Sequence, residues 1–271
     1  MLRTPENNNW AVVSGTEEVI EMVLALGSEP EEFYEKFLPG EEYREFRKYL
    51  STRIKIKKIN GDIQQVMEET RHKITMMQNQ FMRRPLGSQK MMLQALEREQ
   101  NAGIRRAIEV CDAFTPLYRW SFLLERQINT MKMAFYYQVK DFEQVDKLMP
   151  KCLLMDPQAV CLKMARMYMK NEDGIDKLFK KKCSSLKEPA CILPYSLYAW
   201  ILVKQERYED ALKLLVDCKK KTDNETIVRN WEMLANKKYK SFSNSGLGEI
   251  WYAMGLEEMK MPKQQQRIRY R

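Results

Sequence analysis

The sequence predicts an all-α protein, and three observations lead to that fold class. Hydrophobic residues make up 44% of the 271 residues, an ordinary share for a folded chain. There are only 10 glycines and 10 prolines, too few for a turn-rich all-β protein. Apolar residues recur at helical spacing along most of the chain. The nearest alternating stretch, residues 54–57, is too short to bury the face of a strand.

Start and stop signals predict three short helices in the first 60 residues. Pro39-Gly40 ends the second helix, and the aromatic side chains of the third share one helix face. The expected helices cover residues 17–27, 31–38 and 41–58. Their aromatic residues are interleaved with glutamates, so the segment is expected to form either a small helical core or a partner-binding surface.

Two long helices are expected next. Asn60-Gly61 is predicted to break the chain before a helix over residues 63–82, and Arg-Pro-Leu-Gly at 84–87 forms the following break. A second long helix is expected over residues 89–113. Pro116 then suits the first turn of another helix, because a first-turn residue needs no backbone N–H.

An internal repeat is the most informative signal, and it is clearest in residues 196–223. Ala199 stands at a small position on a first helix, Tyr208 at an aromatic position before a second helix, and Ala211 at a small position within that helix. This pattern resembles the tetratricopeptide repeat, a helix–turn–helix unit of about 34 residues.

An earlier stretch, residues 128–158, is similar to the same template. Tyr136 takes the aromatic site on the first helix, and Phe142 corresponds to Tyr208 about two repeat lengths further on. A third, degenerate unit is therefore expected between them, over residues 159–189.

The resemblance covers residues 126–223 and implies an architecture. Proteins of this family form a right-handed helical-repeat stack, a TPR-like α-solenoid, with a concave groove. Here the stack would carry an N-terminal helical extension, and residues 224–237 would cap it. The expected segments are a partly loose N-terminal helical segment (1–60), a helical hairpin region (61–125), the repeats with their capping helix (126–237), and a short helix with a basic tail (238–271).

The resemblance also implies a function. Repeat stacks of this family bind protein or peptide partners in the groove, so the expectation is a non-enzymatic scaffold or adaptor. Lys132 and the polar groups near it are expected to clamp a partner carboxylate. By register, the partner-facing side chains are Asn129, Lys132, Tyr136, Lys163, Tyr195 and Tyr198.

Net charge supports a second reading. The chain has 46 Lys+Arg against 37 Asp+Glu, a formal charge of +9, which favours anionic partners. An RNA- or ribosome-associated factor that uses lysine clusters and a basic C-terminal tail is therefore the alternative, with a tail that only aids solubility left open. The basic patch comprises Lys237, Lys238, Lys240, Lys260, Lys263, Arg267, Arg269 and Arg271.

Catalytic and metal-binding patterns are not expected. The only histidine is His72, and the six cysteines form no CxxC pair, so neither a zinc site nor a cofactor is predicted. Gly246-Leu247-Gly248 is interpreted as a turn before a short helix, because no P-loop pattern accompanies it. Cys152, Cys183 and Cys218 recur about once per repeat, and each is expected at a small buried position.

No apolar segment reaches the ~18 residues that a membrane-spanning helix needs. The first residues also lack the positive start and apolar run of a signal peptide. These features predict a cytoplasmic protein without a transmembrane segment.

Overall fold

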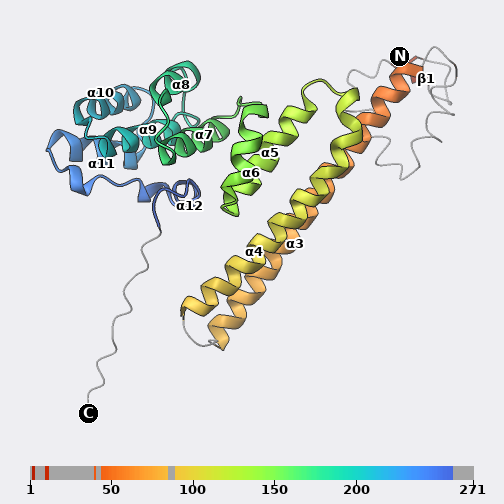
Figure 1. The fold of residues 1–271 in the computed structure, drawn as a ribbon, viewed down its shortest axis with the longest axis horizontal. Coiled ribbons are helices and arrows are strands. Elements are labelled where there is room, and N and C mark those ends of the chain that lie inside the picture. Colours follow the sequence, from red (N-terminus) through yellow and green to blue (C-terminus); the bar gives the residue numbers. More distant parts are fainter. Residues whose placement is uncertain (1, 4–9, 12–39, 41–43, 85–88, 259–271) are drawn as a thin grey trace. The chain divides into compact units, whose positions relative to one another are not determined.

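The computed structural model describes residues 2–3, 10–11, 40, 44–84 and 89–258. It forms two compact units, residues 1–153 (unit 1) and 154–271 (unit 2). In unit 1, β1 (Leu2–Arg3) pairs antiparallel with β2 (Trp10–Ala11) over two residues each. Every other element among the described residues is helical, so the all-α class is confirmed (Figure 1).

Unit 1 is built on a long helical hairpin. Helices α3 (Arg44–Arg83) and α4 (Gln89–Cys111) run side by side (Figure 1). They approach closely where Thr70 of α3 meets Gly103 of α4, because a Cβ at Gly103 would overlap the threonine side chain. The break expected at 84–87 is confirmed by the ends of the two helices, and residues 85–88 lie outside the described part.

The predicted interruption at Asn60-Gly61 is wrong, because α3 continues through it for 40 residues in all. A glycine inside a helix costs only about 1 kcal/mol. Ile54 and Ile63 are buried on either side of it, and their packing offsets that cost. The helix therefore also spans the expected segment boundary after residue 60. The helices expected over residues 17–27 and 31–38 lie outside the described residues.

The chain leaves α4 through a 3₁₀ helix, η2 (Asp112–Trp120), with Pro116 in its interior. The α-helix expected to open at Pro116 is therefore wrong in type and start. The 3₁₀ segment buries Phe114 and Leu117 against Cys111 of α4 and Leu124 of α5 (Leu124–Gln138). Helix α6 (Phe142–Leu148) and η3 (Met149–Lys151) follow, and the rings of Tyr137 and Phe142 meet edge to face at 5.4 Å.

Unit 2 begins with paired helices joined by short turns. Asp156 caps α7 by accepting a hydrogen bond from Ala159 N at 3.0 Å, and Asn224 caps α11 through Thr226 N at 3.0 Å. The elements are α7 (Pro157–Met169), α8 (Ile175–Lys182), α9 (Ile192–Lys204), α10 (Tyr208–Lys219), α11 (Glu225–Ala235), η4 (Tyr239–Ser241), η5 (Ser245–Leu247) and α12 (Glu249–Tyr252).

Helix α9 is the centre of unit 2, since all its residues from Leu193 to Leu202 are buried. It packs on α7 through Tyr168 and Trp200, whose rings lie 5.3 Å apart. It packs on α8 through Phe179, and α10 lies against it on a further side. A helix that is apolar all round is expected in such a central position.

Candidate functional site

Four helices, α5, α7, α9 and α11, end in the same backbone turn. In each, a non-glycine residue adopts the left-handed conformation, with φ between 53° and 61°. These residues are Lys140, Asn171, Glu206 and Lys237, at intervals of 31, 35 and 31 residues. The residue after each one donates its N–H five residues back, in the pairs Asp141–Tyr136, Glu172–Met167, Arg207–Leu202 and Lys238–Met233, at 2.8–2.9 Å. This hydrogen-bond pattern is the Schellman motif.

Helix α11 ends in the same turn as α5, α7 and α9, each of which is the first helix of a pair. The spacing of these turns along the chain is close to the ~34 residues of a helix–turn–helix repeat. The segment expected as a capping helix thus has the ending of a first helix. After α11 the chain enters η4 and η5, and the next α-helix, α12, has only four residues. The sequence did not predict the left-handed residue at Lys140, Glu206 or Lys237, because lysine and glutamate carry no signal for that conformation.

In unit 1, the predicted groove residues differ in exposure. Asn129 is buried, and Tyr136 is half-buried. The Lys132 ammonium donates to Asp112, 20 positions earlier in the chain. Burial alone would lower the pKa of Lys132, but the Asp112 hydrogen bond and charge outweigh it, so the pKa is raised. Lys132 is therefore already paired with a carboxylate of the same unit, that of the exposed Asp112.

In unit 2, two predicted groove residues lie in the interior. The rings of Tyr195 and Tyr198 pack on Phe179 of α8, with centroids 4.9 and 4.4 Å away. The Tyr195 hydroxyl donates to Ser184 O at 3.0 Å and accepts from Lys221 Nζ at 2.7 Å. Lys163 of α7 remains half-exposed. Of the six predicted groove residues, Tyr136 and Lys163 are the two that are neither buried nor held by a side chain of the described part.

The chain covers another side of α9 with its own residues 242–257, the C-terminal strap. The Glu257 carboxylate accepts from both tryptophan indoles, from Trp200 Nε1 at 2.7 Å and from Trp251 Nε1 at 2.8 Å. Asn244 Nδ2 donates to Ser196 O at 2.8 Å. Trp251 is fully buried, and its ring lies 5.7 Å from that of Trp200, so this apolar segment folds back on α9. The strap leaves this side of α9 closed to a partner.

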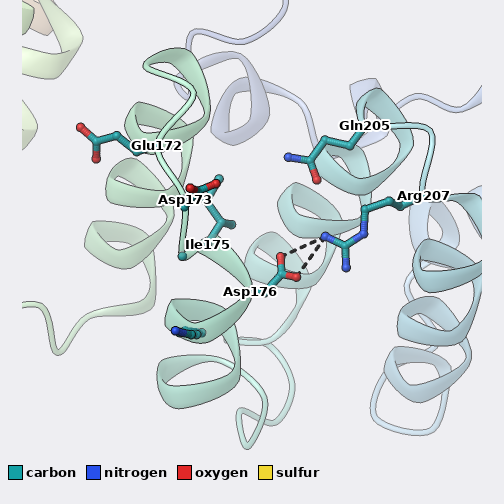
Figure 2. A pocket seen from close by; sticks show the side chains of 8 residues that line it. Glu172, Asp173, Ile175, Asp176, Gln205 and Arg207 are labelled. Atoms are coloured by element: carbon teal, nitrogen blue, oxygen red, sulfur yellow. Dashed lines mark hydrogen bonds and ion pairs between the residues drawn. The ribbon is translucent and has the colours of Figure 1, made fainter.

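A shallow depression of about 600 Å³ lies between the α7–α8 turn and the α9–α10 turn. Figure 2 shows Arg207 reaching across to Asp176, and their closest atoms are 3.0 Å apart. Arg207 also pairs with Asp210 at 2.9 Å. Burial, together with the Asp176 carboxylate, raises the pKa of the Tyr198 hydroxyl. The lining residues Glu172, Asp173, Asp176, Gln205 and Arg207 thus form a polar surface in which the one arginine already has two carboxylate partners.

The lysine clusters of unit 2 fall at two ends of α10. One cluster, Lys180–Lys182, forms the last turn of α8. A second cluster, Lys219–Lys221, lies at the C-terminal end of α10. The two clusters are close together, because Lys221 Nζ donates to Ser184 O just after α8. Lysine at a helix C-terminus suits the helix dipole. The exposed Lys237, Lys238 and Lys240 lie at the other end, because Tyr239 stacks on Tyr208 at 3.7 Å.

These two ends are about 18 Å apart, since α10 has 12 residues. Unit 2 therefore carries two separate basic surfaces. The remaining predicted patch residues, Lys260, Lys263, Arg267, Arg269 and Arg271, lie outside the described part of the chain.

The cysteines are buried as small apolar side chains, as predicted for Cys152, Cys183 and Cys218. Burial raises the pKa of Cys183 to about 11 and of Cys218 to about 12, so neither is a thiolate at neutral pH. His72 is exposed on α3. Within the described ranges, no group of three or more His, Cys, Asp and Glu residues is arranged to hold a metal ion.

The turn at Gly246-Leu247-Gly248 has a packing role. A Cβ at Gly246 would overlap the Thr226 side chain of α11, so glycine lets η5 lie close to that helix.

Among the described residues, no helix has the length and apolar character needed to cross a bilayer. No family model, no curated protein and no solved structure matches the chain.

Proposed function

We propose that the chain is a non-enzymatic scaffold or adaptor that holds a protein or peptide partner on a TPR-like helical stack. The observation that carries the proposal is the Schellman turn shared by α5, α7, α9 and α11 at repeat-like intervals. Repeated helix pairs bury their shared faces and present extended surfaces for partners. The burial of all six thiols and the carboxylate partners of Arg207 also favour a binding role over a chemical one.

The proposed contact in unit 2 is the side of α7 that carries Lys163. The strap covers one side of α9, and Tyr195 and Tyr198 are packed on α8. Lys163 is half-exposed on α7, and its ammonium group is the proposed partner of a carboxylate on the bound protein. Tyr136 is the corresponding contact on α5 in unit 1.

Site-specific photo-crosslinking tests this assignment. A photoreactive amino acid replaces Lys163 in the tagged full chain, and a control chain carries it at Lys213, an exposed position of α10. Irradiation in the native lysate is expected to yield discrete protein adducts at position 163 that are weak or missing at 213. Equal adducts at both positions, or none at 163, would contradict a partner on α7.

One observation favours the RNA- or ribosome-associated alternative. The contact between Lys221 and Ser184 brings two lysine triplets to one end of unit 2. Lys219 lies over the Trp231 ring at 3.5 Å and Lys220 pairs with Asp217, whereas Lys180–Lys182 are exposed. An RNA partner predicts affinity that falls steeply with salt. The salt slope should then shrink in the triple Lys180/181/182→Gln variant or on deletion of residues 260–271.

A further inference from the structure

The end of the α3–α4 hairpin has an unusual charge pattern. Residues 70–84 and 89–96, here named the hairpin tip, contain none of the chain's 37 Asp and Glu residues. They contain five basic residues, Arg71, Lys73, Arg83, Arg84 and Lys90. All five are exposed. Lys73 pairs with Glu99, which lies outside the tip, at 3.6 Å. No carboxylate within the tip neutralises the other four charges, so the complement of the tip is an anionic surface.

Large apolar side chains are exposed on the same tip. Met82 is 76% exposed, Met91 61%, Met76 58% and Leu93 44%. Exposed apolar side chains grouped in one place indicate a contact with a protein or a membrane rather than with nucleic acid alone. Phe81 is buried, so the tip is a packed helical end with additional apolar side chains outside it.

These apolar side chains surround the tip. At 100° per residue, Met76 and Met82 lie about 120° apart around α3, and Met91 and Leu93 about 160° apart around α4. A partner helix or a flat protein face would contact one side of the hairpin. A lipid interface encloses an inserted tip from all sides, so this distribution favours lipid.

The tip also lies away from the core of unit 1. Ile63 belongs to the hydrophobic cluster that joins α3, α4, η2 and α5. From there to Arg83 the helix continues for about 30 Å. The antiparallel course of α3 and α4 is drawn in Figure 1. Such a projecting end reaches a planar surface without rearrangement of the cluster.

We infer that the hairpin tip docks the protein peripherally on an anionic lipid surface. Its methionines and Leu93 enter the boundary between headgroups and acyl chains. The long side chains of Arg83, Arg84 and Lys90 extend back to the lipid phosphates, as arginine and lysine do at membrane interfaces. This role is separate from the partner contact proposed on α7.

Vesicle co-sedimentation of the full chain tests the electrostatic part. Vesicles of phosphatidylcholine mixed with phosphatidylserine are expected to bind the protein, and phosphatidylcholine alone much less. The Arg83→Gln/Arg84→Gln variant is expected to bind about 10- to 30-fold more weakly. The control variant Lys187→Gln/Lys213→Gln removes two exposed charges from unit 2 and is expected to bind as the original protein does.

Environment-sensitive fluorescence tests the apolar part. Met82→Cys introduces an exposed thiol that a nitrobenzoxadiazole dye labels selectively, since the six native thiols are buried. Met155→Cys is the matched control, because Met155 is 75% exposed. Anionic vesicles should raise the emission at position 82 and leave that at 155 unchanged.

Several results would overturn the inference. These are failure to bind anionic vesicles at low salt, unaltered binding by the double arginine variant, or no selective emission rise at position 82. Loss of a protein or RNA partner in the arginine variant without vesicle binding would assign the tip to that macromolecule instead. Failure of the α7 crosslink would leave these outcomes unaffected.

Discussion

Two glycines of the α3–α4 hairpin have opposite surroundings. A Cβ at Gly61 would meet open space, whereas a Cβ at Gly103 would overlap Thr70. Gly61→Ala is therefore expected to raise the free energy of unfolding by about 0.5–1 kcal/mol, because alanine is the better helix former. Gly103→Ala is expected to lower it by about 1–3 kcal/mol through overpacking. Urea unfolding followed by circular dichroism measures both, and equal effects of the same sign would contradict the packing of α3 on α4.

Glu257 holds the strap because each carboxylate oxygen accepts from one indole. In Glu257→Gln, one of the two acceptors becomes an amide NH₂ that faces an N–H donor. The expected loss of stability is about 1–3 kcal/mol. Glu258→Gln is the control, because Glu258 is the exposed neighbour. Tryptophan fluorescence during unfolding reports on Trp200 and Trp251 directly, and indistinguishable variants would show that the strap is not held by this carboxylate.

The buried thiols predict a loss of stability in alkali. Burial raises the pKa of Cys111 and Cys183 from 9.0 to about 11, so the unfolded chain releases these protons first. Between about pH 9 and 11 the unfolded state therefore binds fewer protons, and the free energy of unfolding falls as pH rises. Urea midpoints measured across this range test the sign. The slope should be shallower in Cys183→Ala, and an identical slope in that variant would exclude a contribution from this thiol.

At the scale of elements, the left-handed residue that follows α9 can be tested by substitution. Glu206 has φ 61°, a conformation that glycine adopts without the Cβ penalty. Glu206→Gly is therefore expected to stabilise unit 2 by about 0.5–1 kcal/mol. Lys213→Gly, at an exposed position inside α10, should destabilise it by about 1 kcal/mol. Thermal unfolding measures the change in melting temperature of each variant. Melting temperatures that shift in the same direction would contradict the Schellman geometry.

The elements also show how far sequence patterns extend. The start of the helix expected over residues 224–237 was predicted correctly, because the Asn224 side chain caps α11. Asn60-Gly61 was misleading, because burial on both sides of the pair outweighs the local preference of two residues. The 3₁₀ course of η2 was not predictable, since the packing of Phe114 and Leu117 selects it.

For the whole molecule, the sequence predicted the helical class, whereas the surroundings of the expected groove residues came only from the structure. Tyr195 and Tyr198 were assigned by helix register, and register does not tell which neighbouring helix covers a face. The role of Glu257 depends on two tryptophans far apart in the chain, so no local pattern signals it. The burial of Cys152, Cys183 and Cys218 was predictable, because they recur once per helix pair.

The most direct test of the scaffold proposal is affinity purification of the tagged full chain from its native lysate, with and without nuclease. Mass spectrometry then identifies what stays bound. The account predicts a small set of proteins that survives nuclease and is depleted by Lys163→Glu but not by Lys213→Glu. A set dominated by ribosomal or RNA-binding proteins that disappears with nuclease would contradict it and favour the lysine clusters of unit 2.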